Sequence, residues 1–163
     1  MTRNNVVLSF NDMIHTKNIN IFDCVAQAII HQANCQTTMG SGIAKQIREK
    51  YPEAYEVDCK TVRGDITKLG SFSWVKARDG KHIYNCYSQF RYGKEQRHTD
   101  YEAVYTGLSR IEEHAKSMNL TSLALPYKMG CALGGGSWRI VNAIIEDIFE
   151  ENQIDLYICR YEP

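Results

Sequence analysis

The chain has 163 residues, of which 44% are hydrophobic and 23% are charged, and this is the size and composition of one soluble globular domain. We therefore expect a single domain over residues 1–163. Lysine plus arginine and aspartate plus glutamate each number 19, so the formal net charge is zero. This balance disfavours stable binding of a long polyanion such as nucleic acid, whereas backbone N–H groups can still bind a small anion.

The cysteines and the start of the chain indicate a protein of the reducing cytoplasm. Six cysteines are scattered singly without the spacing of a zinc or redox motif, so we expect free and mostly buried thiols. The histidines show no metal-ligand spacing either, and the sequence predicts neither a metal ion nor a cofactor. It contains no signal-like segment and no apolar run of membrane-spanning length, so we expect a cytoplasmic monomer without membrane contact.

The first half of the chain is predicted to contain four strands and one helix. Apolar runs predict strands at residues 6–10, 25–32, 71–76 and 82–87, and residues 78–81 between the last two form a hairpin turn signal. Helical spacing of apolar residues predicts a helix from Gly42 to Tyr51, which Pro52 ends. Residues 53–70 are polar and favour no single element.

The second half is predicted to alternate helices with strands. Thr99 to Met118 has the pattern of a helix that Thr99 caps together with Glu102, and a second helix is expected at about residues 137–151. Short strands are expected at residues 122–125 and 154–159. This order predicts an α/β fold, a three-layer α/β/α sandwich with a mixed, mostly parallel central sheet. Ligands of such sheets bind at the carboxyl ends of the strands.

Two glycine-bearing loops follow predicted strands and precede predicted helices. The first loop, residues 34–44, contains Gly40 and Gly42, and the second loop, residues 129–136, contains three successive glycines. Glycines allow backbone to approach a ligand closely, and N–H groups at a helix start can bind phosphate. The first loop alone is equally explained as a tight turn, and the alternative for the second loop is a flexible connection, although three successive glycines are rare in a mere connector. Both loops at one edge of the sheet favour a paired cradle for a diphosphate.

Four further features are candidates with open alternatives. Asp12 could accept from an adenine amino group or cap an ordinary turn. Residues 85–93 mix aromatic side chains, amides and an arginine, and they could contact a base or ribose or belong to the core. His31 ends an apolar strand as a core histidine or a base, and Tyr161 could cover an adenine face or only the edge of the core.

Residues 28–35, Met39 to Ala44 and residues 50–52 together resemble the macro domain family. The similarity is greatest to the branch with the terminal ADP-ribose glycohydrolase, the DNA-ADP-ribosylation antitoxin and the yeast-type ADP-ribose-1''-phosphate phosphatase. Residues 129–133 followed by Trp138 resemble the second phosphate loop of that branch, and residues 99–102 fit the start of the intervening helix. The resemblance covers nearly the whole chain, and it rests on two loops that occur in the correct order.

This resemblance implies an ADP-ribose site in a cleft at the end of the sheet. By position, Asp12 and Met13 would lie at the adenine and Asn34 at the distal ribose. The residues that would bind the ligand are Asp12, Met13, Asn34, Met39, Gly40, Ser41, Gly42, Ile43, Ala44, Gln89, Pro126, Gly130, Cys131, Ala132, Leu133, Gly134, Gly135 and Tyr161. Asn34 and His31 are the catalytic candidates, with His31 orienting or deprotonating a water.

Two positions depart from the glycohydrolase pattern of this branch, which has a lysine near residues 88–89 and an aspartate just after residues 130–133. Here the strand offers Gln89 and the loop offers Gly134. A lysine amine can attack a sugar carbon, but a glutamine amide cannot. We therefore expect a phosphatase acting on ADP-ribose 1''-phosphate. The alternatives are a hydrolase that removes ADP-ribose from protein or nucleic acid, and a non-catalytic ADP-ribose-binding module.

Overall fold

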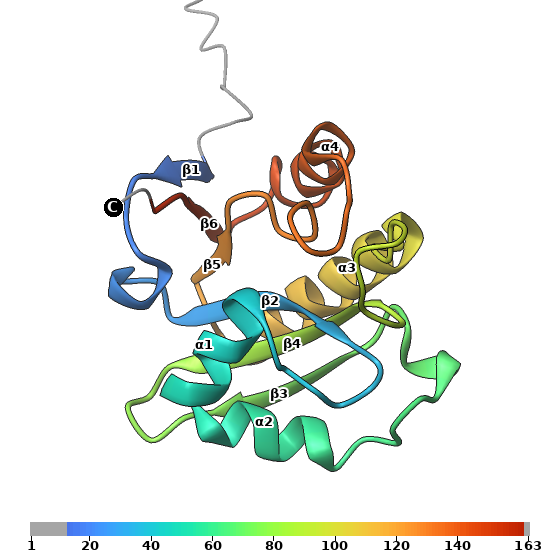
Figure 1. Cartoon of the computed structure of the whole chain (residues 1–163). Coiled ribbons are helices and arrows are strands. Elements are labelled where there is room, and N and C mark those ends of the chain that lie inside the picture. The colour runs from blue at the N-terminus through green and yellow to red at the C-terminus, as the bar shows by residue number, and fades with distance from the viewer. Residues whose placement is uncertain (1–12, 162–163) are drawn as a thin grey trace, which may run out of the picture.

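The computed structural model describes residues 13–161, so Asp12 and the strand predicted at residues 6–10 lie outside the described residues. Six strands and four α-helices follow one another along this part of the chain (Figure 1). In chain order they are β1 (Ile14–Lys17), β2 (Ala28–Asn34), α1 (Gly42–Lys50), α2 (Pro52–Cys59), β3 (Phe72–Lys76), β4 (His82–Gln89), α3 (Tyr101–Ser117), β5 (Ser122–Pro126), α4 (Trp138–Phe149) and β6 (Asp155–Cys159).

The strands form one sheet in the order β1-β6-β5-β2-β4-β3. All neighbouring pairs are parallel except β3 and β4, which form the predicted antiparallel hairpin. The mixed, mostly parallel sheet is therefore confirmed. Strand β2 lies between β5 and β4, so the loop that follows it starts at the middle of the carboxyl edge.

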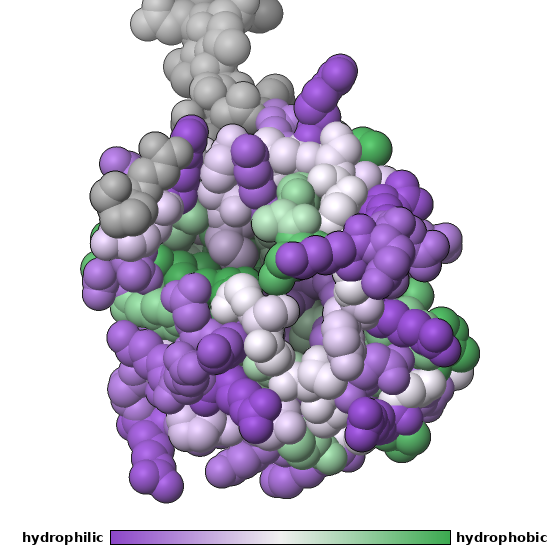
Figure 2. Space-filling model, viewed as in Figure 1, coloured by the Kyte–Doolittle hydropathy of each residue, from purple (hydrophilic) through white to green (hydrophobic). Residues whose placement is uncertain are grey.

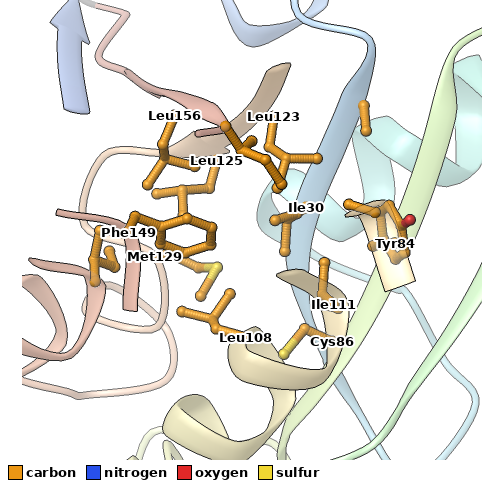
Figure 3. Close-up of a cluster of buried hydrophobic side chains, with 14 of the residues drawn as sticks. Ile30, Tyr84, Cys86, Leu108, Ile111, Leu123, Leu125, Met129, Phe149 and Leu156 are labelled. Carbon is orange, nitrogen blue, oxygen red and sulfur yellow. The ribbon is translucent and has the colours of Figure 1, made fainter. Parts of the chain in front are cut away.

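Helices cover both faces of the sheet, which confirms the three-layer sandwich (Figure 1). On one face, Leu108 and Ile111 of α3 and Val141 of α4 pack with Ile30 and Leu125 of the sheet in the larger hydrophobic cluster (Figure 3). On the other face, Ile47 of α1 and Ala54 of α2 pack against Ile29 and Ile83. Alternate residues of β2 thus point into two separate cores, as the pleat of a strand requires.

Three local features differ from the sequence-based expectations. Thr99 was predicted to cap α3, and this is wrong: Asp100 is the N-cap, and its side chain accepts from the backbone N–H of Ala103 at 2.9 Å. Thr99 is buried instead. The segment predicted to have no preferred element contains α2. Pro52 lies in the first turn of this helix, where a missing backbone N–H costs no intrahelical hydrogen bond. Strand β1 was not predicted.

None of the helices between residues 13 and 161 is long and apolar enough to cross a membrane. The six cysteines are free thiols, four of them buried, whereas Cys59 is exposed and Cys131 is half-buried. Among the described residues, no group of three or more His, Cys, Asp or Glu side chains lies close enough together to hold a metal ion.

Candidate ligand-binding site

A cavity of about 230 Å³ lies where β2, β4 and β5 end, between the two glycine-bearing loops. Its floor consists of Gln32, Ala33, Asn34 and Gln89, and its walls are residues 39–44 of the first loop and residues 126–130 and 132–134 around the second. Weakly polar and apolar residues occupy the centre of the face seen in Figure 2, with strongly hydrophilic residues around them. Lys128 is the one charged residue among the described residues that line the cavity.

Most of the predicted site residues come together at this cavity. Those that line it are Asn34, Met39, Gly40, Ser41, Gly42, Ile43, Ala44, Gln89, Pro126, Gly130, Ala132, Leu133 and Gly134. His31, Met13, Cys131, Gly135 and Tyr161 are not among the lining residues. Asp12 lies outside the described residues, so its expected contact with adenine stays a prediction.

The first loop has an unusual backbone that its own side chains support. Thr37 and Met39 adopt φ angles of 60° and 40°, which a residue with a Cβ atom, and above all a β-branched one, rarely does. The Asn34 side chain accepts from the backbone N–H of Gln36 at 2.8 Å and donates to the Thr38 hydroxyl at 2.8 Å. These contacts close the turn locally, and the start of the loop is held by distant residues: the Cys35 N–H donates to Phe90 O at 3.1 Å, and the Gly64 N–H donates to Cys35 O at 2.7 Å.

Helix α1 begins at this loop, and no side chain caps the backbone N–H groups of its first turn. Ser41 is the N-cap residue, yet its side chain makes no capping hydrogen bond. Gly42 follows with a φ of 57° and lines the cavity together with Ser41. Backbone N–H groups in the first turn of a helix attract anions through their partial positive charge. The wall formed by α1 can thus bind a phosphate group.

The second loop depends on residues distant in the sequence. The Thr99 hydroxyl donates to Gly130 O at 2.6 Å, and the backbone N–H groups of His98 and Thr99 both donate to Gly134 O. Within the loop, the Gly136 N–H also donates to Gly130 O, at 2.8 Å. The segment before α3 therefore lies directly beneath the loop and fixes its carbonyl groups.

His31, the predicted water-orienting residue, is placed elsewhere. It is completely buried on the face of β2 that carries α1 and α2, and its Nε2 lies 2.6 Å from Asn85 Oδ1. Burial lowers the pKa of His31 to about 4, although the hydrogen bond to Asn85 acts in the opposite direction. The side chain does not reach the cavity, so the structure gives it no contact with a ligand there.

Basic and aromatic residues meet at the rim of the cavity where β5 and β6 end. The Lys128 ammonium lies 5.5 Å and the Arg160 guanidinium 4.9 Å from the centre of the Tyr127 ring. Lys128 has a φ of 58°, and the Trp138 ring packs edge-on against Tyr127 with ring centres 5.1 Å apart. An aromatic face beside two cations is suited to a nucleoside that carries phosphate.

The sequence analysis missed Gln32, Tyr127 and Lys128 as lining residues, and it assigned Thr99 only the role of a helix cap. Gln32 lies within the strand that was predicted, and the alternation of its side chains separates it from His31. The signal in the sequence was a polar residue within an apolar strand. Because His31 and Gln32 are both polar, this signal does not say which of the two faces the cavity. Only the positions of the covering helices show which of them faces the cavity.

The fold and the two loops agree with the comparisons to known proteins. The model of the Macro domain family matches residues 30–145, which include both loops. An uncharacterised 17.5 kDa protein of Enterobacteria phage T4 is 30% identical over 139 residues, which cover 83% of this chain and 86% of the phage protein. The chain therefore belongs to the macro domain family.

Two further relatives belong to the same family. The human ADP-ribose glycohydrolase OARD1 is 27% identical over 139 residues, covering 85% of each chain. The solved structure of the macrodomain of Mycobacterium tuberculosis DarG has a TM-score of 0.74 and 29% sequence identity, and the match covers 93% of this chain and 98% of that one.

Proposed function

We propose that the cavity binds ADP-ribose, with the diphosphate between the two glycine-bearing loops. The observation that carries this proposal is the arrangement of the walls: an uncapped helix N-terminus on one side, and a glycine-rich turn with Lys128 on the other. Two such walls can donate backbone N–H groups to one diphosphate from opposite directions. The sequence position of both loops in a macro domain supports the same assignment.

The two ends of the ligand are assigned by the order of the strands. Asn34 and Gln89 are register partners at the ends of β2 and β4, and they form the distal-ribose end. The adenosine lies toward β5 and β6, where Tyr127 and Arg160 are close together. A cavity of about 230 Å³ is below the range of about 300–1,000 Å³ typical of sites for drug-sized ligands, so the adenosine extends along the rim.

The reaction we propose is hydrolysis of ADP-ribose 1''-phosphate to ADP-ribose and phosphate. Water attacks the phosphorus, the bond from phosphorus to the 1'' oxygen breaks, and the 1'' oxygen takes up a proton. Backbone N–H groups of the first loop stabilise the charge on the phosphoryl oxygens. Gln89 cannot act as an amine nucleophile, and this favours attack by water over a covalent route.

The second candidate is removal of ADP-ribose from a protein or a nucleic acid. It is favoured by the human relative, which is named an ADP-ribose glycohydrolase. Both candidates act on a substituent at the 1'' position of the distal ribose, so they require the same bound ligand and differ in the leaving group. A binding module without catalysis is the third outcome.

Isothermal titration calorimetry with ADP-ribose, its 1''-phosphate, NAD and ADP tests the ligand. We expect ADP-ribose and the 1''-phosphate to bind more tightly than ADP, and Asn34→Ala to weaken both by about tenfold, which is about 1.4 kcal/mol. The matched control is Asn142→Ala, because Asn142 is half-buried on α4, does not line the cavity, and donates to Glu146 at 3.0 Å. The absence of heat with ADP-ribose would rule out the proposed site.

Two product assays separate the reactions. Phosphate release from ADP-ribose 1''-phosphate supports the first candidate, and release of free ADP-ribose from modified protein or DNA without phosphate supports the second. Tight binding without turnover in either assay leaves the non-catalytic module. Asn34→Ala serves as the site variant in both assays, and retention of full turnover in that variant would remove Asn34 from the mechanism.

A further inference from the structure

A chain of four polar side chains lies beneath the second loop, where β2, β4 and the start of α3 meet. Gln32 Nε2 donates to Gln89 Oε1 at 2.5 Å and to Thr99 Oγ1 at 3.0 Å. Gln32 Oε1 accepts from the Ser88 hydroxyl at 2.7 Å. Gln32, Ser88 and Thr99 are buried, whereas Gln89 is half-buried and lines the cavity. We call these four residues the amide network.

The direction of every hydrogen bond in the amide network is determined by its two ends. At one end the Thr99 hydroxyl donates to Gly130 O; because a carbonyl can only accept, the proton of Thr99 is used there. Thr99 must therefore accept from Gln32. Both protons of Gln32 Nε2 are then used, one on Thr99 and one on Gln89, and its oxygen faces Ser88.

The same reasoning fixes the amide of Gln89. Its oxygen accepts from Gln32, and its nitrogen donates to Arg91 O at 2.8 Å. Rotating this amide by half a turn would put two donors face to face at Gln32 and two acceptors face to face at Arg91. The contact with Gln32 is part-buried and the contact with Arg91 is exposed, so the mismatch at Gln32 is the costlier one, and it holds Gln89 in one orientation.

The glycines of the second loop leave space for this network. A Cβ atom on Gly134 would overlap Thr99 Oγ1 and lie 2.7 Å from Gln32 Nε2. A Cβ atom on Gly130 would lie 2.8 Å from Gln32 Oε1. Distances below 3.0 Å are essentially never observed for a Cβ atom. The network therefore occupies the volume that side chains at both positions would require.

After its internal contacts, Gln89 retains one amide proton and one oxygen lone pair for a ligand. A fixed group that can donate and accept at adjacent atoms matches a sugar hydroxyl, which does the same, better than a phosphate oxygen, which only accepts. Its register partner Asn34 retains one proton of Nδ2 after donating to Thr38. The two amides face the cavity at the end assigned to the distal ribose.

We propose that Gln89 determines specificity for the hydroxyls of the distal ribose, and that Gln32 and Thr99 are positioning residues that hold its amide in the recognising orientation. This inference rests on the proposed binding of ADP-ribose and deepens it. It assigns recognition of the sugar to the amide network and recognition of the diphosphate to the backbone of the loops. The two kinds of recognition are therefore separable by mutation.

Thr99→Val is the decisive variant, because valine has the shape of threonine without its hydroxyl. Gly130 O keeps its bond from the Gly136 N–H, so the loop stays connected. The Gln32 amide, however, loses the Thr99 acceptor that fixes its orientation. Calorimetry is expected to show about tenfold weaker ADP-ribose binding, which is about 1.4 kcal/mol, with ADP binding unchanged. Thr99→Ser restores the hydroxyl and is expected to restore most of the affinity.

Two further variants keep the test informative. Gln89→Met preserves the length of the side chain without its polar atoms, and it is expected to reduce ADP-ribose binding as much as Thr99→Val does. Thr121→Val is the matched control, because Thr121 also donates a side-chain hydrogen bond to a glutamine, Gln27, but at the opposite end of β5. It is expected to change neither affinity.

The outcomes distinguish this inference from the proposed function. If the wild-type chain binds neither ADP-ribose nor ADP, the proposed function fails. If it prefers ADP-ribose and both Thr99→Val and Gln89→Met keep that preference, the role of the amide network is overturned while the proposed function stands. An equal loss of ADP-ribose and ADP affinity, accompanied by a lower melting temperature, would reduce Thr99 to a structural residue.

Discussion

The two glycine-bearing loops reach the same cavity but are held in place in different ways. The turn of the first loop is closed by the Asn34 side chain, which bonds to Gln36 and Thr38, whereas only the backbone of Cys35 at its start bonds to the distant residues Phe90 and Gly64. The second loop is held by Thr99 and His98, which lie more than thirty residues before it in the sequence. The turn of the first loop has two non-glycine residues with positive φ, Thr37 and Met39, whereas the second loop has glycines at its closest contacts.

The glycines of the two loops are therefore explained by different surroundings. In the first loop, Gly40 has no atom closer than 3.9 Å to a Cβ that would be added there, so the fold leaves room for a side chain. In the second loop, Gly134 is surrounded by Thr99, Gln32 and Gly130. We infer that Gly40 keeps the cavity open for a ligand and that Gly134 is required by the fold itself.

The largest expected effect comes from adding one methyl group to each of these glycines. Gly134→Ala overpacks a buried polar network and is expected to cost about 3 kcal/mol of unfolding free energy. Gly40→Ala is expected to leave that free energy within about 0.5 kcal/mol while weakening ADP-ribose binding. Urea denaturation and calorimetry measure the two quantities, and equal destabilisation of both variants would contradict the comparison.

The strand that leads into the first loop provides the next largest effect, through His31. Burial lowers its folded pKa to about 4, whereas the unfolded value is about 6.5. Between these values the unfolded chain binds the extra proton, so stability is complete above pH 6.5 and decreases as the pH falls toward 4. From pH 7 to pH 5 we expect a loss of about 2 kcal/mol from this residue.

His31→Gln isolates that contribution, since glutamine can still donate to Asn85 but does not titrate. Other groups also make stability depend on pH, among them Asp58, whose pKa is raised by burial and whose effect on stability has the opposite sign. They cancel in the difference between the wild-type and variant denaturation curves at each pH. The same loss of stability in both proteins would exclude His31 as the cause.

The sequence predicted the architecture and the first loop more completely than the floor of the site. Apolar periodicity and the proline and glycine signals are local, so five of the six described strands, three of the helices and the hairpin over residues 78–81 could be located, whereas β1 and α2 were missed. His31 and Gln32 are adjacent in β2, so their side chains point to opposite faces of the sheet. Which of them faces the cavity depends on the helices that cover each face, and these are placed by contacts distant in the sequence. Thr99 resembled a helix cap because Asp100, one residue later, has the same local chemistry.

The smallest expected effect tests the strain of the first loop directly. Thr37 has a φ of 60° and a buried hydroxyl oxygen without a hydrogen-bond partner among the described residues. Asn119, which follows α3, has nearly the same φ of 57°, and asparagine tolerates this left-handed conformation better than a β-branched residue. We expect Thr37→Asn to raise the unfolding free energy by about 0.5–1 kcal/mol.

The reciprocal variant Asn119→Thr is the matched control, because it places threonine in the same backbone conformation far from the cavity. It is expected to lower the unfolding free energy by a similar amount, so the double variant should be close to wild type. If Thr37→Asn stabilises the chain but weakens ADP-ribose binding, the strain is connected with the ligand. If Thr37→Asn fails to stabilise while Asn119→Thr destabilises, the packing of the Thr37 methyl group outweighs the strain of its backbone.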